Sequence, residues 1–545
     1  MSTEKRMLLA IVLIMGVTFV WSKLFFPQQS QQSTNAKNII AEQNSDQAAQ
    51  TATESLPQVL DLTPDRKKTS QAKVIALQNI EFETPESFGT VSSHMASLQS
   101  FELTTYKLQQ KQGAPGVSLV PFTPDSKAPL QWKYTLGEKT FFDRDLYYQV
   151  VEKDTDHVSF RAQLLPQVFV EKTWYFQSKP YVLDLDLRII NQSLSDQALN
   201  VQIQNFARPK ENTKKTGIFS MFSSREQPLR AMAYVNEKNY HWTYEDILDG
   251  ENLSPKGSVS WLGFDSQYFV FSVLPDQGNW SGVEASTQDE QAVISAIYPD
   301  RTLASGKVQE FSVKVYAGPK DIDLLREVGN DLDLSIDYGI WGPIARPILS
   351  LLRWIHGFVP NYGFAIIILT LLVRALMFPL VQKQARSMKK MQAHQPAMNA
   401  LKEKHGEDKE AYTRELMTYM RTHKINPMGG CLLLLPQMPI FFALYRVLYN
   451  AVELRHAPFA LWIKDLSSHD PFYVLPVLVG ITFFLQSKLN PTPTSDPAQQ
   501  TMMKIMPVMF SVFMVFLPSG LNLYIFVSTV WGIVQQYIVQ RKPAV

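Results

Sequence analysis

The sequence contains one cysteine, Cys431, among its 545 residues. A single thiol excludes an intramolecular disulfide and a metal site built from several cysteines. A phosphate-binding G-x-x-x-x-G-K-[ST] motif is also absent, and His94, His157 and His241 show no metal-ligand spacing. We therefore expect no cofactor, no metal ion and no catalytic residues, and we interpret the protein as a non-enzyme.

The long apolar runs of the sequence contain no acidic residues. One run, residues 361–382, is about twenty residues long and at ~1.5 Å per residue matches a hydrocarbon core of roughly 30 Å. This run contains Arg374. No Asp or Glu lies in it or in the other five runs, which are residues 7–26, 428–449, 472–489, 502–517 and 519–539.

Arg374 therefore has no counter-ion within the predicted membrane spans. A guanidinium at this depth costs about 3 kcal/mol or more, so it should face protein, water or a partner rather than lipid. One interpretation is a charge in a water-filled cavity that receives acidic groups in transit. The alternative is an arginine that snorkels to the cytoplasmic headgroups. Position in the sequence alone leaves both interpretations open.

The amino end predicts a membrane anchor followed by a tether. Lys5 and Arg6 hold residues 1–6 in the cytoplasm. The anchor at 7–26 ends in Val-Trp-Ser-Lys, which offers no small-x-small cleavage site, so we expect an uncleaved signal anchor. Residues 27–70 are rich in Gln, Ser, Asn, Ala and Thr and predict a flexible linker.

Residues 71–335 predict a large soluble domain of antiparallel β-sandwich type. In residues 181–190, apolar side chains alternate with charged ones, as in a strand with one buried face. The pattern favours a binding or spacing module, and a surface loop explains NYHWTYED better than an acid/base pair of His241 and Glu245. Further strands are expected at 168–176, 201–206, 268–273 and 311–317.

Two helical segments flank the arginine-containing span. Residues 339–357 place Ile344, Ile348 and Ile355 on one face and predict an amphipathic helix in the membrane interface, with packing on the soluble domain as the alternative. Residues 383–425 predict a cytoplasmic helical hairpin, because they are basic and Gly406 interrupts their helical period.

The carboxyl-terminal part predicts four further spans, at 428–449, 472–489, 502–517 and 519–539. Their connections are a periplasmic loop at 450–471, a cytoplasmic loop at 490–501 and a tight turn at Pro518-Ser519-Gly520, and the chain ends in a cytoplasmic tail at 540–545. With the anchor this makes six crossings. Both termini then lie in the cytoplasm and the large domain lies in the periplasm.

These features resemble the YidC/Oxa/Alb family of membrane protein insertases in its six-span Gram-negative form. The motifs are the lone Arg374, the sequence QMPIFFALY that begins at Gln437 within the span 428–449, and the turn PSGLNLY that ends at Tyr524. The resemblance implies an inner-membrane protein that inserts newly made membrane proteins and helps them fold, through a hydrophilic groove open to the cytoplasm and to lipid. It also implies that Arg374, Thr370, Gln437 and Tyr524 line or border the groove, whereas Ile525 stands where some relatives have a second tyrosine.

The resemblance further implies partners, namely nascent membrane proteins, the ribosome–nascent chain complex, the Sec translocon with its accessory subunits and the lipid bilayer, without recognition of nucleic acid sequence. Two other classes of protein stay open from the residues alone. A secondary transporter could also use a buried charge, although ion coupling usually needs acidic residues in the spans. A membrane-tethered carbohydrate-binding protein could carry such a β-sandwich.

Overall fold

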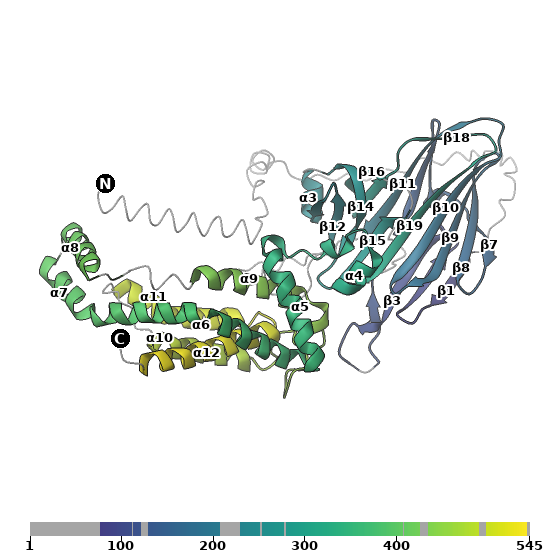
Figure 1. Ribbon diagram of the computed structural model, residues 1–545. Coiled ribbons are helices and arrows are strands. Elements are labelled where there is room, and N and C mark those ends of the chain that lie inside the picture. Colours follow the sequence, from purple (N-terminus) through teal and green to yellow (C-terminus); the bar gives the residue numbers. More distant parts are fainter. Residues whose placement is uncertain are drawn as a thin grey trace, which may run out of the picture. The chain divides into compact units, whose positions relative to one another are not determined.

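The computed structural model describes residues 77–111, 113–120, 129–207, 229–250, 253–276, 280–406, 408–423, 425, 434–489 and 497–541 (Figure 1). The predicted anchor at 7–26 and linker at 27–70 lie outside these residues. The described helices at residues 394–425 form a unit separate from the rest, and each unit is described by itself.

The large domain consists of two antiparallel sheets of very unequal size. One has four strands in the order β1-β2-β3-β4, and the other has fifteen, with the path β6-β5-β11-β17-β16-β14-β15-β19-β10-β9-β8-β7 and with β12, β13 and β18 beside it. The antiparallel prediction is confirmed, but the hydrogen bonds do not divide the strands into two comparable layers. The strands of the small sheet are β1 (Asn79–Glu83), β2 (Ser87–Ser92), β3 (Ser97–Lys107) and β4 (Gly116–Ser118). Those of the large sheet are β5 (Gln131–Leu136), β6 (Lys139–Phe142), β7 (Gln149–Lys153), β8 (His157–Leu165), β9 (Val168–Lys179), β10 (Val182–Asn191), β11 (Gln197–Ala207), β12 (Arg230–Val235), β13 (Lys238–Trp242), β14 (Lys256–Asp265), β15 (Phe269–Pro275), β16 (Trp280–Gln288), β17 (Gln291–Ile297), β18 (Arg301–Leu303) and β19 (Val308–Pro319).

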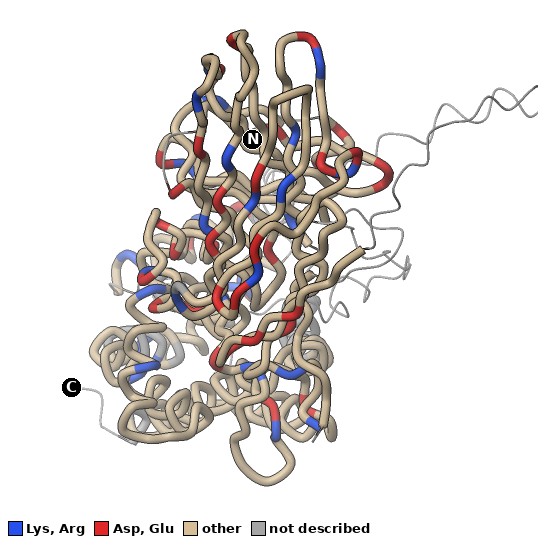
Figure 2. The backbone as a smooth tube through the Cα atoms, turned by 90° about the vertical axis from the view of Figure 1, so that its right-hand side faces the viewer, with Lys and Arg blue, Asp and Glu red and all other residues tan. Residues whose placement is uncertain are grey.

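Alternation of apolar and charged residues produces these strands, and β10 shows it most clearly. Its Leu185 and Leu187 are fully buried, whereas Asp186 between them and Arg188 after them are not. The strand pairs with β9 and β19, so one face meets the core while the other carries charges into solvent. The other four predicted strands correspond to β9, β11, β15 and β19. Figure 2 shows the acidic and basic residues distributed along the strands.

The segment NYHWTYED is not the surface loop that its sequence predicts. His241 lies in β13, and Glu245 lies in the first turn of α3 (Tyr244–Asp249), whose N-cap is Thr243. The His241 Nδ1 atom is buried and has no hydrogen-bond partner within the described part of the chain, so it does not pair with Glu245. Burial lowers the pKa of His241, which keeps the imidazole neutral at neutral pH.

A charged pair lies wholly inside the large sheet. Lys172 of β9 forms an ion pair with Asp143, which begins the short 3-10 helix Asp143–Asp145, and both side chains are completely buried. The remaining capacity of the carboxylate is filled by the backbone amide of Trp132 at 2.6 Å and by the hydroxyls of Tyr134 at 2.9 Å and Tyr148 at 2.7 Å. Such a pair is tolerated in a core only when its hydrogen bonds are satisfied, as they are here.

Two residues of β9, Lys172 and Trp174, join the small sheet to the large one. Lys172 Nζ donates to the carbonyl of Met95 at 3.0 Å, and Trp174 Nε1 donates to the carbonyl of Ala96 at 3.0 Å. Met95 and Ala96 have φ values of 63° and 46°, a region that costs a non-glycine residue conformational energy. The buried ammonium and indole therefore stabilise the strained turn that leads into β3.

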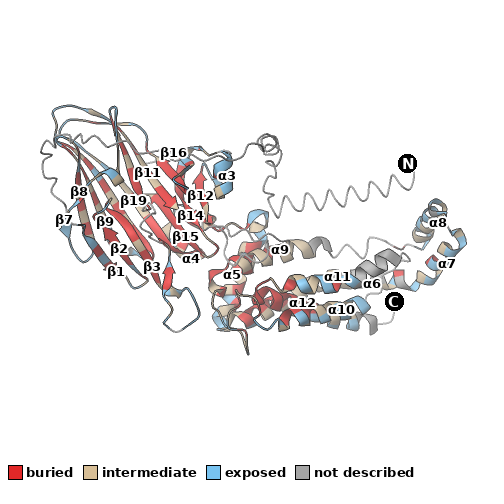
Figure 3. Ribbon diagram, turned by 180° about the vertical axis from the view of Figure 1, so that it is seen from behind, coloured by how far each residue is buried: buried red, intermediate tan, exposed pale blue. Residues whose placement is uncertain are grey.

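Six helices follow the β domain and form most of the remaining described chain. They are α5 (Gly342–Phe358), α6 (Tyr362–Ala393), α9 (Leu434–Asn450), α10 (Val474–Leu489), α11 (Pro497–Met514) and α12 (Ser519–Arg541). Helix α12 packs against α6, α9 and α10, while α11 packs against α10. The large apolar side chains of Leu376, Ile481 and Val512 are at least half exposed, as expected where a bundle meets lipid. Figure 3 shows exposed positions along α6, α10 and α11.

Helix α6 is the one helix in the described residues long and apolar enough to cross a membrane by itself, over residues 362–382. The candidate span ends at Gln382, but α6 continues without a break to Ala393 and includes the first part of the predicted hairpin segment 383–425. Neither glycine nor proline lies between residues 380 and 393, and the basic residues there are good helix formers.

Helix α5 lies between the β domain and the bundle. It buries Leu349, Leu352 and Ile355 against α9 and α6 and exposes Trp354 and Phe358. Its Arg353 forms an ion pair at 3.6 Å with Asp321, the N-cap of α4 (Ile322–Val328), and another at 3.6 Å with Glu453. The helix therefore packs on the bundle and is joined to α4 by Arg353, and its place in the membrane interface stays a prediction.

The separate unit is a helical hairpin of α7 (Gln395–His405) and α8 (Lys409–Thr422). Polar contacts join its two helices, namely His394 Nδ1 to the Tyr419 hydroxyl at 2.8 Å and Lys404 to Glu415 at 3.0 Å. Gly406, with φ of 50°, ends α7 as its position in the sequence suggested.

Removing the ammonium of the buried pair should destabilise the β domain strongly. Lys172→Ala leaves the Asp143 carboxylate without its cation inside the core, at an expected cost of about 3–5 kcal/mol in unfolding free energy. Lys139→Ala, at an exposed position of β6, should cost less than about 0.5 kcal/mol. Denaturant unfolding of the purified full-length chain, followed by tryptophan fluorescence, measures both. Equal losses for the two variants would mean that the pair contributes nothing.

Candidate functional site

Arg374 lies on α6 within the part of the helix that can span the membrane, and it points toward α12. Its guanidinium is half-buried, and its Nε donates a hydrogen bond to the Ser528 hydroxyl at 2.8 Å. Nη2 donates to the same oxygen. Ser528 is itself buried, so one serine oxygen accepts two of the donors of the buried cation.

Tyr524 extends this contact to a third helix. It lies one turn before Ser528 on α12, and residues four apart in a helix share a face. Its side chain interacts with Ser528 and with Gln437 of α9. Helices α6, α9 and α12 thus each supply polar side chains to one cluster, which we call the arginine cluster and define as Arg374, Ser528, Tyr524 and Gln437.

The arginine cluster holds a positive charge among neutral groups. The sequences of α6, α9, α10, α11 and α12 contain no Asp or Glu. Tyr524 is the titratable group that interacts with the guanidinium. Within the described residues, the cation therefore has hydrogen-bond acceptors but no carboxylate, and it can attract an acidic group that enters the bundle.

Polar side chains of α12 continue on both sides of the arginine cluster. Gln535 is buried and its amide nitrogen lies 3.5 Å from the carbonyl of Phe378 on α6. The Thr529 and Thr482 hydroxyls are 2.9 Å apart and join α12 to α10. These contacts hold α12 between α6 and α10, which fixes the position of Ser528 relative to Arg374.

The structure brings together three of the four residues that the resemblance suggested, and it separates the fourth. Thr370 lies one turn before Arg374, but it is completely buried and its hydroxyl donates to the carbonyl of Ile366 at 2.6 Å. Its side chain therefore bonds its own helix and not the arginine cluster. Ser528 was missed by the sequence analysis, although its spacing of four residues from Tyr524 could have indicated it.

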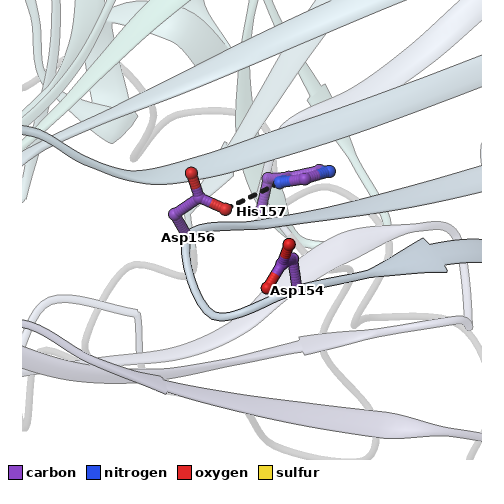
Figure 4. A group of neighbouring side chains, drawn as sticks. All are labelled: Asp154, Asp156 and His157. Carbon is purple, nitrogen blue, oxygen red and sulfur yellow. Dashed lines mark hydrogen bonds and ion pairs between the residues drawn. The ribbon is translucent and has the colours of Figure 1, made fainter.

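A second group of polar residues lies far from the bundle, in the turn between β7 and β8. Asp154, Asp156 and His157 bring possible metal-ligand atoms within 4.8 Å of one another (Figure 4). His157 Nδ1 is 2.8 Å from Asp156 Oδ1, and this hydrogen bond raises the pKa of His157. This Asp-x-Asp-His pattern at residues 154–157 was not predicted from the sequence. The two aspartates are exposed, and we assign no metal to the group.

Comparison with known proteins covers the entire described chain. A family model described as "60Kd inner membrane protein" matches residues 354–544, and one described as "YidC periplasmic domain" matches residues 79–351. The membrane protein insertase YidC of Geotalea daltonii is 33% identical over 551 residues, covering 99% of this chain and all of that protein. The YidC of Magnetococcus marinus is 40% identical over 381 residues, covering 69% of this chain and 67% of that protein.

Solved structures give two further similarities. A crystal structure of an active YidC insertase, with its first transmembrane domain resolved, is 19% identical with a TM-score of 0.38, covering 86% of this chain and 94% of that one. A galactose mutarotase-like protein from Lactobacillus casei is 11% identical with a TM-score of 0.32 and covers 44% of this chain and all of that one. On the evidence of the family models and the relatives in sequence, the chain belongs to the YidC family of inner-membrane insertases, which are not enzymes and which carry a periplasmic domain.

Proposed function

We propose that this chain inserts newly made proteins into the inner membrane, and helps them fold, through a polar groove whose centre is Arg374. The observation that carries the proposal is the arginine cluster. In this cluster Ser528 of α12 accepts hydrogen bonds from a half-buried guanidinium, and none of the helices α6, α9, α10, α11 and α12 supplies a carboxylate. Gln437 and Tyr524 supply further polar surface, and Thr370 contributes to the wall by packing.

The physical advantage of such a groove is a lower barrier for polar segments. An unsatisfied backbone group in dry hydrocarbon costs several kcal/mol, so a translocating segment gains by passing along polar side chains and water. The guanidinium attracts acidic side chains during this passage. Burial of the substrate's apolar helix in lipid and the membrane potential can then drive insertion, and neither requires a nucleotide.

The proposed topology has six spans with both termini in the cytoplasm. Helices α6, α9, α10, α11 and α12 would supply five, and residues 7–26, outside the described residues, the sixth. The basic character of α7 and α8 supports their placement on the cytoplasmic side. Nascent chains, ribosomes and the Sec translocon are the partners proposed for this arrangement. The absence of acidic residues from the five helices argues against an ion-coupled transporter.

Replacing the arginine tests whether its charge or its shape is used. Arg374→Lys should keep much of the insertion activity, because a wet groove needs attraction more than two-pronged hydrogen bonding. Arg374→Ala should slow insertion of substrates with acidic translocated segments several-fold more than that of neutral ones. Lys488→Ala, which removes a cation of α10 that lies over the Phe484 ring, serves as the control. It should leave the insertion rates of acidic and of neutral substrates unchanged. Equal impairment of acidic and neutral substrates in Arg374→Ala would contradict the proposal.

The contact between Arg374 and Ser528 is tested by a double-mutant cycle. Ser528→Ala should destabilise the wild-type protein by roughly 1.5–3 kcal/mol, because a hydrogen bond to a charged group is lost in a buried setting. In an Arg374→Met background the same change should cost less than about 0.5 kcal/mol. Unfolding of the detergent-solubilised protein measures all four chains, with Ser528→Thr as the variant that keeps the hydroxyl. An equal cost in both backgrounds would show that the serine acts independently of the arginine.

The hairpin is tested by deletion. The change replaces residues 395–422 by a flexible Gly/Ser linker of about twelve residues. The other helices should stay folded, but insertion should be abolished, because the polar helices α7 and α8 directly follow α6 in the chain and are proposed to receive the substrate. Growth after depletion of the wild-type protein measures function, and Glu415→Gln, which removes the charge that pairs with Lys404 and His405, is the milder control. Full complementation by the deletion would make the hairpin a simple connector.

A further inference from the structure

A cavity of about 460 Å³ lies at the corner of the β domain where β1 approaches the turn between β7 and β8. It is lined by Ile80, Glu81, Phe82 and Glu83 of β1, by Lys153 of β7, by Asp154 and Thr155 of the turn, and by Phe176 of β9. Its volume is within the range of about 300–1,000 Å³ typical of ligand sites. No residue of the arginine cluster lines this cavity.

The cavity runs along the edge of β1 and not over one of its faces. Successive side chains of a strand point to opposite faces, and four consecutive residues of β1 line the cavity. Within the described part of the chain, β1 pairs with β2 alone, so its second edge faces the cavity. An edge of this kind presents peptide groups to which another strand can bond.

The register shows which peptide groups of β1 point outward. Thr84 and Ser87 exchange backbone hydrogen bonds at the hairpin turn, and Ser93 donates to the Gln78 carbonyl at 2.8 Å. Hydrogen-bonded positions alternate along an antiparallel pair, so Ile80 and Phe82 bond β2. The amides and carbonyls of Glu81 and Glu83 therefore point away from β2 toward the cavity.

The charge of the corner is acidic and its floor is apolar. Glu81, Glu83 and Asp154 line it against a single cation, Lys153, and Asp156 lies beside it in the turn (Figure 4). Both glutamates are exposed and share one face of β1. Phe82 and Phe176 stack beneath them, with ring centres 4.2 Å apart and planes at 6°, which gives the corner a rigid base.

We propose that this corner binds an extended basic segment of another polypeptide, which adds a strand to the outer edge of β1 and places alternate Lys or Arg side chains beside Glu81 and Glu83. Strand addition supplies hydrogen bonds from the main chain, while the pockets for alternate side chains supply selectivity. Residues directly opposite on antiparallel strands have Cβ atoms roughly 5 Å apart, within reach of an ion pair. The site is independent of the groove proposed around Arg374.

Peptide binding to the full-length protein in detergent tests this site. The probe is a fluorescein-labelled peptide of alternating Lys and Val residues, followed by fluorescence anisotropy at low ionic strength, because salt screens exposed charges. Two control peptides carry Glu in place of Lys, or Pro in place of Val, the latter keeping the charge but lacking the amides of a strand. We expect saturable binding of the first peptide and at least about tenfold weaker binding of both controls.

Variants of the protein give the second arm of the experiment. Glu81→Lys with Glu83→Lys should weaken binding of the Lys/Val peptide at least about tenfold, and the neutral pair Glu81→Gln with Glu83→Gln should give a smaller loss. Glu284→Lys, at an exposed position of β16, is the matched control and should bind as the wild type does. An unchanged affinity in both double variants, or equal affinity for the proline peptide, would overturn the proposal.

Two alternative occupants of this corner, the chain's own basic segment and a metal cation, would give different results in the binding experiment. If the peptide binds only after Arg66, Lys67 and Lys68 are replaced by alanine, the chain's own basic segment is the ligand and an external partner is excluded. If Mn²⁺ displaces the peptide from the wild type but not from His157→Ala, the corner is a cation site and the proposal fails. Binding that is unaffected by the alanine replacements and by Mn²⁺ supports an external basic strand.

Discussion

The bundle depends on keeping a guanidinium inside a membrane span without giving it a carboxylate. A counter-ion would stabilise Arg374 but would also neutralise the charge on which the proposed attraction of acidic segments depends. The observed solution is a serine that accepts two hydrogen bonds, backed by a tyrosine that reaches a glutamine on a third helix. Neutral acceptors reduce the cost of desolvation while the net charge stays in place. The packing of α12 between α6 and α10 keeps Ser528 within hydrogen-bond distance of Arg374.

Much of this arrangement could be predicted from the residues, because strong local patterns carry it. The lone charge in an apolar run identified Arg374, and strict alternation identified β10. Ser528 was not predicted, since a serine in a membrane helix usually bonds its own backbone, and its contact with Arg374 joins residues 154 positions apart. Thr370 illustrates the opposite case. Its place on the helix was suggested correctly, but nothing in a one-dimensional pattern shows that its hydroxyl turns back to Ile366.

The β domain shows the same limit on prediction. The alternation of apolar and polar residues predicts strands and their faces, yet Lys172 belongs by its charge to the solvent side and lies in the core. Only the three-dimensional arrangement reveals why, since Asp143 and two tyrosines surround it. Edge positions are equally hidden in the sequence. For β1, only the pairing of the described strands shows that one of its edges lies open to a cavity.

The uninterrupted length of α6 has a mechanical consequence. Its 32 residues extend about 48 Å, so the backbone that carries Arg374 continues as one rod to the start of the hairpin at residue 394. The only weak point is Pro379, which has no amide to donate and leaves the carbonyl of Ala375 without its usual helical partner. Torque applied at the far end of α6 must therefore either rotate the guanidinium about the helix axis or be absorbed as a bend at this proline.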